Sequence, residues 1–278
     1  MKHIYLNLKR FDIPREKGGV NSIASPSEWG KYIVENTQDQ LKAFKDVEFA
    51  MFFPEAHLIP ASGAKNENSP VKIGTQGLFW GDTAVGGPFG AFTTSLTGNA
   101  ASSLGAEYAL IGHCEERNKL ASIFAEAGVT DTLAVNRILN KEILAAQKAG
   151  LKVLYCIGEK DTELENWDKV LFEQLSVGLN GVDKSSVAVA YEPIWSIGPG
   201  KTPADKPYIT KVAKFVKETT GGLSVVYGGG LKVDNAEMLA SIPEIDGGLI
   251  ALTRFKGDIG FYPDEYIEII KTYLGVNR

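Results

Sequence analysis

The chain has 278 residues, of which 44% are hydrophobic and 23% are charged. This composition is typical of a globular protein with a large buried core, and it excludes a disordered or fibrous chain. With 29 Lys and Arg against 34 Asp and Glu, the net charge is -5. Because both signs are spread along the chain without blocks of like charge, no nucleic-acid partner is expected.

The cysteine content and the N-terminal segment bear on the cellular compartment. The chain has two cysteines, Cys114 and Cys156, and therefore no disulfide framework, and no Cys/His spacing resembles a structural zinc site. The segment MKHIYLNLKRF places charges inside a short apolar alternation, unlike a signal peptide. No stretch approaches the roughly 18 apolar residues of a membrane helix. We therefore expect a cytoplasmic protein without membrane contact and without a bound metal.

Short apolar runs rich in β-branched and aromatic residues recur along the whole chain. These runs are typical of buried strands. They predict eight strands, at residues 3–8, 47–53, 71–75, 108–111, 152–157, 187–191, 224–227 and 248–252.

Segments with a helical spacing of apolar residues lie between most of these strands. The segment 55–68 is the exception, because it is polar and poorly patterned. Gly150 follows one of the helical segments and is a candidate C-cap just before a buried strand. The predicted helices span residues 28–44, 96–104, 131–149, 167–177, 207–219, 235–239 and 264–273.

The regular alternation of strands and helices predicts a parallel sheet, because parallel strands need crossover connections. Eight units without a long linker favour an α/β fold of one (β/α)8 barrel domain over residues 1–278, with an open doubly wound sheet as the alternative. No GxGxxG motif follows the first strand, and Gly18-Gly19 opens no helix. A nicotinamide cofactor is therefore not expected, nor is any other cofactor.

In a (β/α)8 barrel the active site is built from the loops that follow the carboxyl ends of the strands. Polar residues at these positions are few. A carboxylate base, an imidazole, an ammonium group and Gly-rich loops suit proton transfer on an anionic substrate. The residues concerned are Asn7 and Lys9 after the first strand, His113 and Glu115 after the fourth, Glu192 after the sixth, glycines 228–230 after the seventh and residues 251–254 after the eighth.

Four of these strand ends carry longer motifs: NLK at 7–9, IGHCEER at 111–117, AYEPIWSIGPGKT at 190–202 and YGGGLK at 227–232. Together they resemble the strand-end signatures of the triosephosphate isomerase family, in the same order and at comparable spacing, and they cover the full chain. The resemblance implies an aldose–ketose isomerase that acts on a small phosphorylated sugar.

The resemblance also implies a role for each matching residue. Glu192 would be the base that removes a proton from the carbon beside the carbonyl, and neutral His113 would polarise the carbonyl oxygen. Lys9, with Asn7 beside it, would supply positive charge to the enediolate. Glu115 would pair with Lys9 and orient it.

Further positions would bind the substrate phosphate. The segment 193–202 would form a closing lid, and the backbone N–H of Gly198 would reach the phosphate. Gly229 and Gly230 after the seventh strand keep backbone donors, although the family usually has Gly-Gly-Ser here. Pro199, where a Thr is common between the lid glycines, lacks an N–H.

The end of the eighth strand departs most from the family pattern. The family usually carries Gly-Gly where this chain has Ala251 and Leu252, and a Cβ at a position of close backbone approach either excludes the anion or displaces it. Arg254 allows two interpretations. Its guanidinium could replace the missing donors with bidentate phosphate contacts, or it could form an ordinary salt bridge.

The loop at residues 76–94 is longer than the family's usual dimerisation loop and contains Phe79, Trp80 and Phe89. Exposed aromatic residues on a long loop need a partner surface, so we expect a homodimer. His3 and His57 match no motif and are interpreted as structural or exposed. Cys114 and Cys156 are interpreted as small buried residues.

Three functions are left by these observations. Because Lys9, His113 and Glu192 are intact, isomerisation of a triose phosphate is the first. The change at Ala251 and Leu252 allows a four-carbon ketose phosphate of the erythrulose phosphate type as the alternative. A barrel that binds phosphosugars without catalysis is the third.

Overall fold

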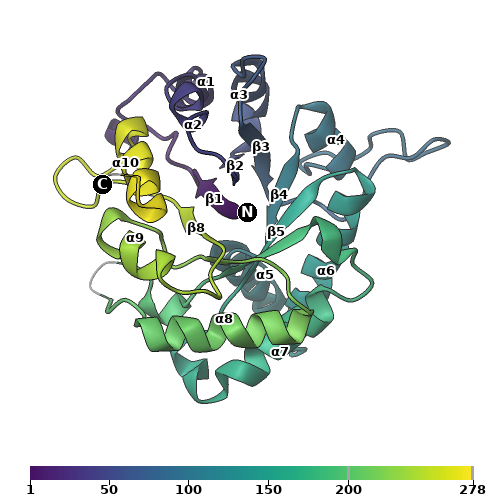
Figure 1. Cartoon of the computed structure of the whole chain (residues 1–278). Coiled ribbons are helices and arrows are strands. Elements are labelled where there is room, and N and C mark those ends of the chain that lie inside the picture. The colour runs from purple at the N-terminus through teal and green to yellow at the C-terminus, as the bar shows by residue number, and fades with distance from the viewer. Residues whose placement is uncertain (199–200, 277–278) are drawn as a thin grey trace.

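A computed structural model describes residues 1–198 and 201–276 of the chain. It contains a closed barrel of parallel strands in the order β1 to β8, with helices around it (Figure 1). This architecture confirms the predicted single (β/α)8 barrel and excludes the open sheet. The strands are β1 Lys2–Asn7, β2 Val47–Phe53, β3 Val71–Gln76, β4 Tyr108–Ile111, β5 Lys152–Ile157, β6 Val187–Tyr191, β7 Val225–Tyr227 and β8 Gly247–Ile250.

The helices cover the outside of the barrel (Figure 1). Most of them connect one strand to the next and return the chain to the other end of the barrel, as parallel strands require. They are α1 Trp29–Glu35, α2 Gln38–Leu41, α3 Leu58–Gly63, α4 Gly98–Ser103, α5 Cys114–Glu126, α6 Ala134–Lys148, α7 Trp167–Gly178, α8 Lys206–Thr220, α9 Val233–Ala240 and α10 Pro263–Leu274. Short 3-10 turns lie at Arg15–Lys17, Glu55–His57, Asp161–Asn166, Lys184–Ser186 and Ile194–Ser196.

The apolar strands are buried on both faces, which explains their continuous apolar runs. Side chains that point inward form a cluster made only of strand residues, in which Tyr5 contacts Phe52 and Tyr108 at ring-centroid distances of 6.1 Å each. Outward side chains of the same strands, such as Ile4 and Leu6, join the larger cluster beneath the helices. The barrel is therefore filled with side chains and positions its loops rigidly.

Closure of the barrel depends on a close approach of β1 and β8. His3 pairs with Gly247 in the register of these strands. A Cβ at Gly247 would lie 1.7 Å from the His3 carbonyl oxygen, so no larger residue fits at this position.

Apart from shifts of up to three residues at the ends of elements, the observed elements differ from the sequence prediction in three places. The helix expected at 28–44 is broken, because the Thr37 hydroxyl donates to the Ile33 carbonyl oxygen at 2.7 Å and the Asn36 side chain donates to Tyr32 at 2.8 Å. Helix α3 lies within the segment 55–68. It was not predicted, because this short helix buries only Leu58 and Ala61.

Helix α5 is not among the helices predicted from apolar spacing. It has 13 residues, but Arg117 is the only residue that it buries, so it has no apolar stripe to reveal its length. Strand β8 ends at Ile250, which leaves Ala251 and Leu252 in the loop that follows. In the described part of the chain, no helix has the length and apolar character needed to cross a membrane.

Candidate active site

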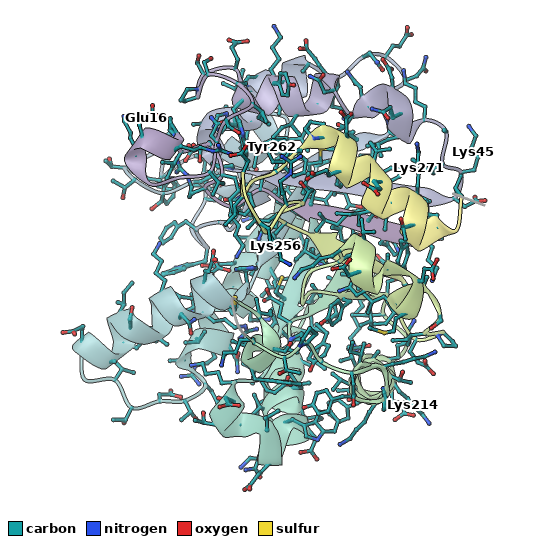
Figure 2. All side chains as sticks on the ribbon, turned by 90° about the vertical axis from the view of Figure 1, so that its left-hand side faces the viewer. Glu16, Lys45, Lys214, Lys256, Tyr262 and Lys271 are labelled. Carbon is teal, nitrogen blue, oxygen red and sulfur yellow. The ribbon has the colours of Figure 1, made fainter. Side chains whose placement is uncertain are left out.

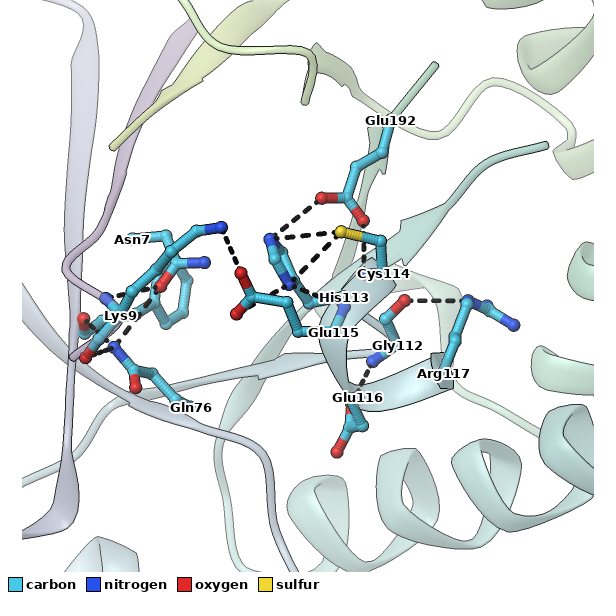
Figure 3. A network of polar contacts seen from close by, with 11 residues as sticks. Asn7, Lys9, Gln76, Gly112, His113, Cys114, Glu115, Glu116, Arg117 and Glu192 are labelled. Carbon is cyan, nitrogen blue, oxygen red and sulfur yellow. Dashed lines mark hydrogen bonds and ion pairs between the residues drawn. The ribbon is translucent and has the colours of Figure 1, made fainter. Parts of the chain in front are cut away.

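The carboxyl ends of β1, β4 and β6 bring together the residues that the strand-end rule selected (Figure 3). Asn7 is the last residue of β1, and Glu192 directly follows β6. His113 lies between β4 and α5, where it is the N-cap residue of the helix. The network formed by these residues with Lys9 and Glu115 is drawn in Figure 3.

The backbone of Lys9 has an unusual conformation. Its φ of 41° lies in the left-handed region, which is strained for a lysine. Asn7 Oδ1 accepts a hydrogen bond from the Lys9 N–H at 3.1 Å, and Gln76 Nε2 donates to the Lys9 carbonyl oxygen, also at 3.1 Å. The same Gln76 amide donates to the Phe52 carbonyl oxygen at 3.0 Å. These contacts from β1, β2 and β3 hold the lysine at the mouth of the barrel.

The Lys9 ammonium is paired with one carboxylate. Lys9 Nζ donates to Glu115 Oε1 at 2.6 Å. Partial burial acts to raise the pKa of Glu115, but the hydrogen bond and the charge of Lys9 outweigh it and lower that pKa. Glu115 therefore stays ionised and orients the lysine side chain.

His113 is buried and has a defined hydrogen-bonding pattern. Its Nδ1 accepts a hydrogen bond from the Glu115 N–H at 3.2 Å, so the neutral ring carries its proton on Nε2. Burial, together with the positive charge of Lys9, lowers the pKa of His113 to about 4. The N-terminal end of α5 also disfavours a cation at this position. The imidazole is therefore neutral near pH 7.

Glu192 lies against this histidine. Its Oε1 is 3.1 Å from His113 Nε2, and its Oε2 accepts a hydrogen bond from the Cys114 N–H at 3.0 Å. The Glu192 residue is only 2% exposed. Burial raises the pKa of its carboxyl to about 8, against the opposing effects of the Cys114 hydrogen bond and the Lys9 charge. A carboxylate in such surroundings is a strong base and a neutral imidazole beside it is a hydrogen-bond donor.

Residues behind the site fix the turn that carries His113. Glu116 Oε2 accepts from the Gly112 N–H at 2.5 Å, and Arg117 Nε donates to the Gly112 carbonyl oxygen at 2.8 Å. Arg117 also donates to the Tyr155 hydroxyl at 3.0 Å. Both residues belong to the IGHCEER motif, but sequence reasoning assigned them no role.

Gln76 is a second omission. It is the last residue of β3, so the strand-end rule that selected Asn7 would also have selected it.

The start of the segment expected to form a lid is hydrogen-bonded to another buried carboxylate. Glu159 follows β5, and its Oε1 accepts hydrogen bonds from the Tyr191 hydroxyl at 2.8 Å, Trp195 Nε1 at 2.8 Å and the Tyr208 hydroxyl at 3.1 Å. Burial raises the pKa of Glu159 above its ordinary value despite these hydrogen bonds. Sequence reasoning also missed Glu159.

The lid contains one of the predicted phosphate ligands. Gly198, expected to contact the phosphate, is exposed and has a φ of 119°. Pro199 and Gly200, the remainder of the lid tip singled out from the sequence, lie outside the described residues.

The rim after β7 and β8 lies apart from the network in Figure 3. Gly229, Gly230, Ala251 and Leu252 are all partly buried at these strand ends. Arg254 Nε donates to Glu265 Oε1 at 2.7 Å, and its guanidinium lies 3.9 Å from the centre of the Tyr262 ring. The salt-bridge interpretation therefore describes Arg254 here, because its guanidinium is engaged by α10 and the adjoining loop.

The cysteines and the other histidines have different surroundings. Cys156 is buried as predicted, but Cys114 is only partly buried because it begins α5 at the site. His57 is buried, with Nε2 3.3 Å from Asp12 Oδ2, and His3 Nδ1 lies 3.1 Å from Glu48 Oε1. Both of these histidines thus contact carboxylates away from the network.

Three side chains of the network could in principle hold a metal ion. The donor atoms of His113, Cys114 and Glu192 lie within 4.8 Å of one another. Two of these donors are the imidazole and the carboxylate that face each other at 3.1 Å. An ion here would therefore occupy the groups that are suited to proton transfer.

Comparisons with known proteins agree with this geometry. The family model for triosephosphate isomerase matches residues 25–272. A triosephosphate isomerase of Acaryochloris marina is 34% identical over 194 residues, which are 68% of this chain and 73% of that protein. One of Pseudoalteromonas translucida is 30% identical over 240 residues, which are 81% of this chain and 87% of that protein.

A solved structure shows the same fold. The triosephosphate isomerase of Bartonella henselae superposes with a TM-score of 0.73 at 21% identity, over 98% of this chain and 99% of that one. The family match and the two relatives, together with the barrel, establish that this chain belongs to the triosephosphate isomerase family and is an aldose–ketose isomerase.

Proposed function

We propose that the chain interconverts dihydroxyacetone phosphate and glyceraldehyde 3-phosphate through an enediol intermediate. The observation that carries this proposal is the pairing of buried Glu192 with neutral His113 at 3.1 Å, with Lys9 beside them. The site residues come from β1, β4 and β6, so we infer that residues 1–278 act as one domain. The two free cysteines fit a reducing cytoplasm.

The chemistry follows from the state of each group. Ionised Glu192 takes a proton from the carbon beside the carbonyl, and the released electron pair forms a carbon–carbon double bond while the carbonyl oxygen becomes an oxyanion. His113 Nε2–H donates to that oxygen and moves a proton between the two oxygens of the enediol. Protonated Glu192 then returns its proton to the neighbouring carbon, which completes the isomerisation.

Charge and enclosure support these steps. The Lys9 ammonium stabilises the oxyanion because it is held in place before the charge develops. The lid at 193–202 closes over the substrate and excludes water, which restrains the loss of phosphate from the enediol. Neither step requires a cofactor. A barrel that binds phosphosugars without catalysis would not need the intact set of Lys9, His113 and Glu192.

A second candidate substrate is a four-carbon ketose phosphate of the erythrulose phosphate type. The side chains of Ala251 and Leu252 at the mouth of β8 favour it, because they stand where the family usually has two glycines. They would move the phosphate away from the β8 backbone and alter the distance between the phosphate and the reacting carbons.

The substrate comparison is the most direct test of the proposed function. We expect kcat/KM to be higher for dihydroxyacetone phosphate than for erythrulose phosphate when both are measured on the same preparation. The opposite ranking would assign the four-carbon substrate to an unchanged set of catalytic groups. If neither compound is isomerised, the proposed function is wrong.

Replacement of Glu192 tests the assignment of the base. Glu192→Gln should lower kcat by about 100- to 10,000-fold, the range for loss of a general base, while binding of 2-phosphoglycolate is retained. Glu192→Asp should also lose activity because its shorter side chain withdraws the carboxylate. Glu218→Gln on the exposed face of α8 is the matched control and should turn over as the native protein does. Undiminished turnover of Glu192→Gln would refute this assignment.

The raised pKa of Glu192 predicts the pH dependence of the reaction. Only the ionised carboxylate accepts a proton, so kcat/KM should fall by about tenfold per pH unit below that pKa. Because the pKa is raised to about 8, this fall should begin well above the range of an ordinary carboxyl. A profile in which kcat/KM stays constant down to pH 5 would contradict the raised pKa of Glu192.

The raised pKa of Glu192 also affects the free energy of unfolding. A carboxyl whose pKa is raised by folding stabilises the folded state fully below its unfolded pKa, and this contribution is lost as the pH rises through the folded pKa. Urea unfolding of the native protein should therefore show a loss of stability between about pH 4.5 and pH 8, which is absent from Glu192→Gln.

We also propose that the chain forms a homodimer through the loop predicted at residues 76–94, which belongs to the connection between β3 and α4. This loop extends away from the barrel beside α4 (Figure 1) and is closed at its base by the Phe79 N–H, which donates to the Leu96 carbonyl oxygen at 2.8 Å. Trp80, next to this base, is 42% exposed, and Phe89, farther along the loop, is 84% exposed. Apolar side chains held this far from the core gain stability only against another surface.

Sedimentation velocity tests the dimer. Phe89→Asp should raise the dissociation constant by at least about 10-fold, since burial of one large apolar side chain contributes about 1.5–3 kcal/mol. Phe172→Asp, at an exposed residue of α7, should sediment as the native protein. A native protein that is monomeric at micromolar concentration, or a dimer unaffected by Phe89→Asp, would rule out this interface.

A further inference from the structure

The rim between β7 and β8 carries a lysine to which the sequence motifs give no role. Lys232 ends the YGGGLK segment and is the N-cap residue of α9. Its backbone is fixed on both sides, because the Leu231 N–H donates to the Leu249 carbonyl oxygen at 3.0 Å and the Lys232 N–H donates to Asn235 Oδ1 at 2.8 Å. Asn235 Nδ2 in turn donates to the Gly230 carbonyl oxygen at 2.9 Å. The side chain thus starts from a rigid point on the rim.

The stem of Lys232 lies along the glycine loop after β7. Its Cε is 3.5 Å from the position that a Cβ on Gly230 would occupy. Gly230 has a φ of 91°, a conformation that L side chains rarely adopt, so this spot is left to the lysine stem. Lys232 therefore lies beside the backbone to which the family resemblance assigns phosphate binding.

The ammonium group reaches from one loop to the next. Lys232 Nζ lies 4.1 Å from the centre of the Phe255 ring, and Phe255 belongs to the loop between β8 and α10. Phe255 is 44% exposed, and a cation on an exposed aromatic ring is held only weakly. The ammonium is thus placed at the junction of the β7 and β8 loops, where barrels of this class frequently bind phosphate.

Two cations of the rim are already ion-paired. Arg254 is paired with Glu265, and Lys9 is paired with Glu115. Within residues 1–198 and 201–276, no carboxylate forms an ion pair with Lys232. Its positive charge is therefore available to an anion.

The residues at the end of β8 are the reason that phosphate binding would need a side-chain cation. Ala251 and Leu252 carry side chains where the phosphate would otherwise approach two glycines, so the β8 backbone is less accessible to it. A lysine ammonium is a compact point charge on a flexible stem, and it can follow a displaced phosphate. We propose that Lys232, in place of Arg254, binds the phosphate of the substrate by moving from the Phe255 ring into the junction of the two loops. This inference rests on the proposed function, because it takes the substrate to be a sugar phosphate.

Binding of 2-phosphoglycolate, measured by isothermal titration calorimetry, tests the proposal independently of turnover. Lys232→Met keeps the stem and removes the charge. It should weaken binding by about 10- to 100-fold, the factor that corresponds to one hydrogen bond to a charged group. Lys232→Arg should retain most of the binding, because it keeps a cation at the same place. Inorganic phosphate, as a competing ligand, should lose affinity for Lys232→Met in parallel.

Two variants of the β8–α10 loop serve as controls. Lys256 is exposed on this loop, which also carries Tyr262 (Figure 2), so Lys256→Met removes the same charge nearby and should leave binding unchanged. Arg254→Met should likewise bind the ligand as the native protein does. The proposal is overturned if Lys232→Met binds 2-phosphoglycolate as tightly as the native protein, if Lys256→Met weakens binding equally, or if the native protein binds neither anion.

Turnover of the native protein distinguishes a failure of the proposed function from a failure of the proposal about Lys232. A native protein that isomerises neither ketose phosphate disproves the proposed function. The calorimetric comparison of Lys232→Met with Lys256→Met still decides whether Lys232 is the phosphate ligand.

Discussion

Burial of the Glu192 carboxylate is the constraint on which the rest of the site depends. Ionising a carboxyl group that is 2% exposed is costly, and the cost raises its pKa to about 8. Such a group is a stronger base than an exposed glutamate. The backbone that carries it is held by the neighbouring strand, since the Glu192 N–H donates to the Ile157 carbonyl oxygen at 2.7 Å. Gly158 has no side chain because a Cβ there would lie 1.9 Å from the Glu192 carbonyl oxygen.

The protonation states of Glu192 and His113 both depend on the positive charge of Lys9 nearby. The charge of Lys9 favours ionisation of Glu192 and opposes protonation of His113, so it acts in the useful direction on both. Glu115 neutralises part of this charge and also donates its backbone N–H to His113 Nδ1. One residue of the first turn of α5 thus fixes the lysine through its side chain and the imidazole tautomer through its backbone. This double use explains why the helix must begin directly after His113.

The sequence was sufficient for the barrel and for selecting the polar residues that lie together at its mouth, because both depend on local patterns. Five of the eight predicted strands begin at the observed residue, and apolar runs such as 187–191 match the structure at both ends. Lys9, His113 and Glu192 could be located because each comes within two residues of the end of such a run.

Residues whose role depends on contacts with segments distant in the sequence were harder to identify from the sequence. Glu159 collects three hydrogen bonds from Tyr191, Trp195 and Tyr208, which are far from it in sequence. No spacing rule predicts such a group. Arg254 was left between two interpretations because its partner, Glu265, lies on the following helix. Helix α5 was not predicted because its burial is confined to one polar residue.

The rim after β7 and β8 shows how a conserved chemical task can be carried by different groups. Backbone N–H donors next to glycines bind an anion at a fixed position, because the loop itself sets their direction. A lysine side chain binds through charge and adjusts its length, so it tolerates a phosphate that has moved. The chain as a whole carries a net charge of -5, which repels a dianion at long range. Binding therefore requires a local excess of positive charge. Arg254 and Lys9 are paired to glutamates, whereas the ammonium of Lys232 lies on the exposed Phe255 ring where the two loops meet and is placed to contribute to that excess.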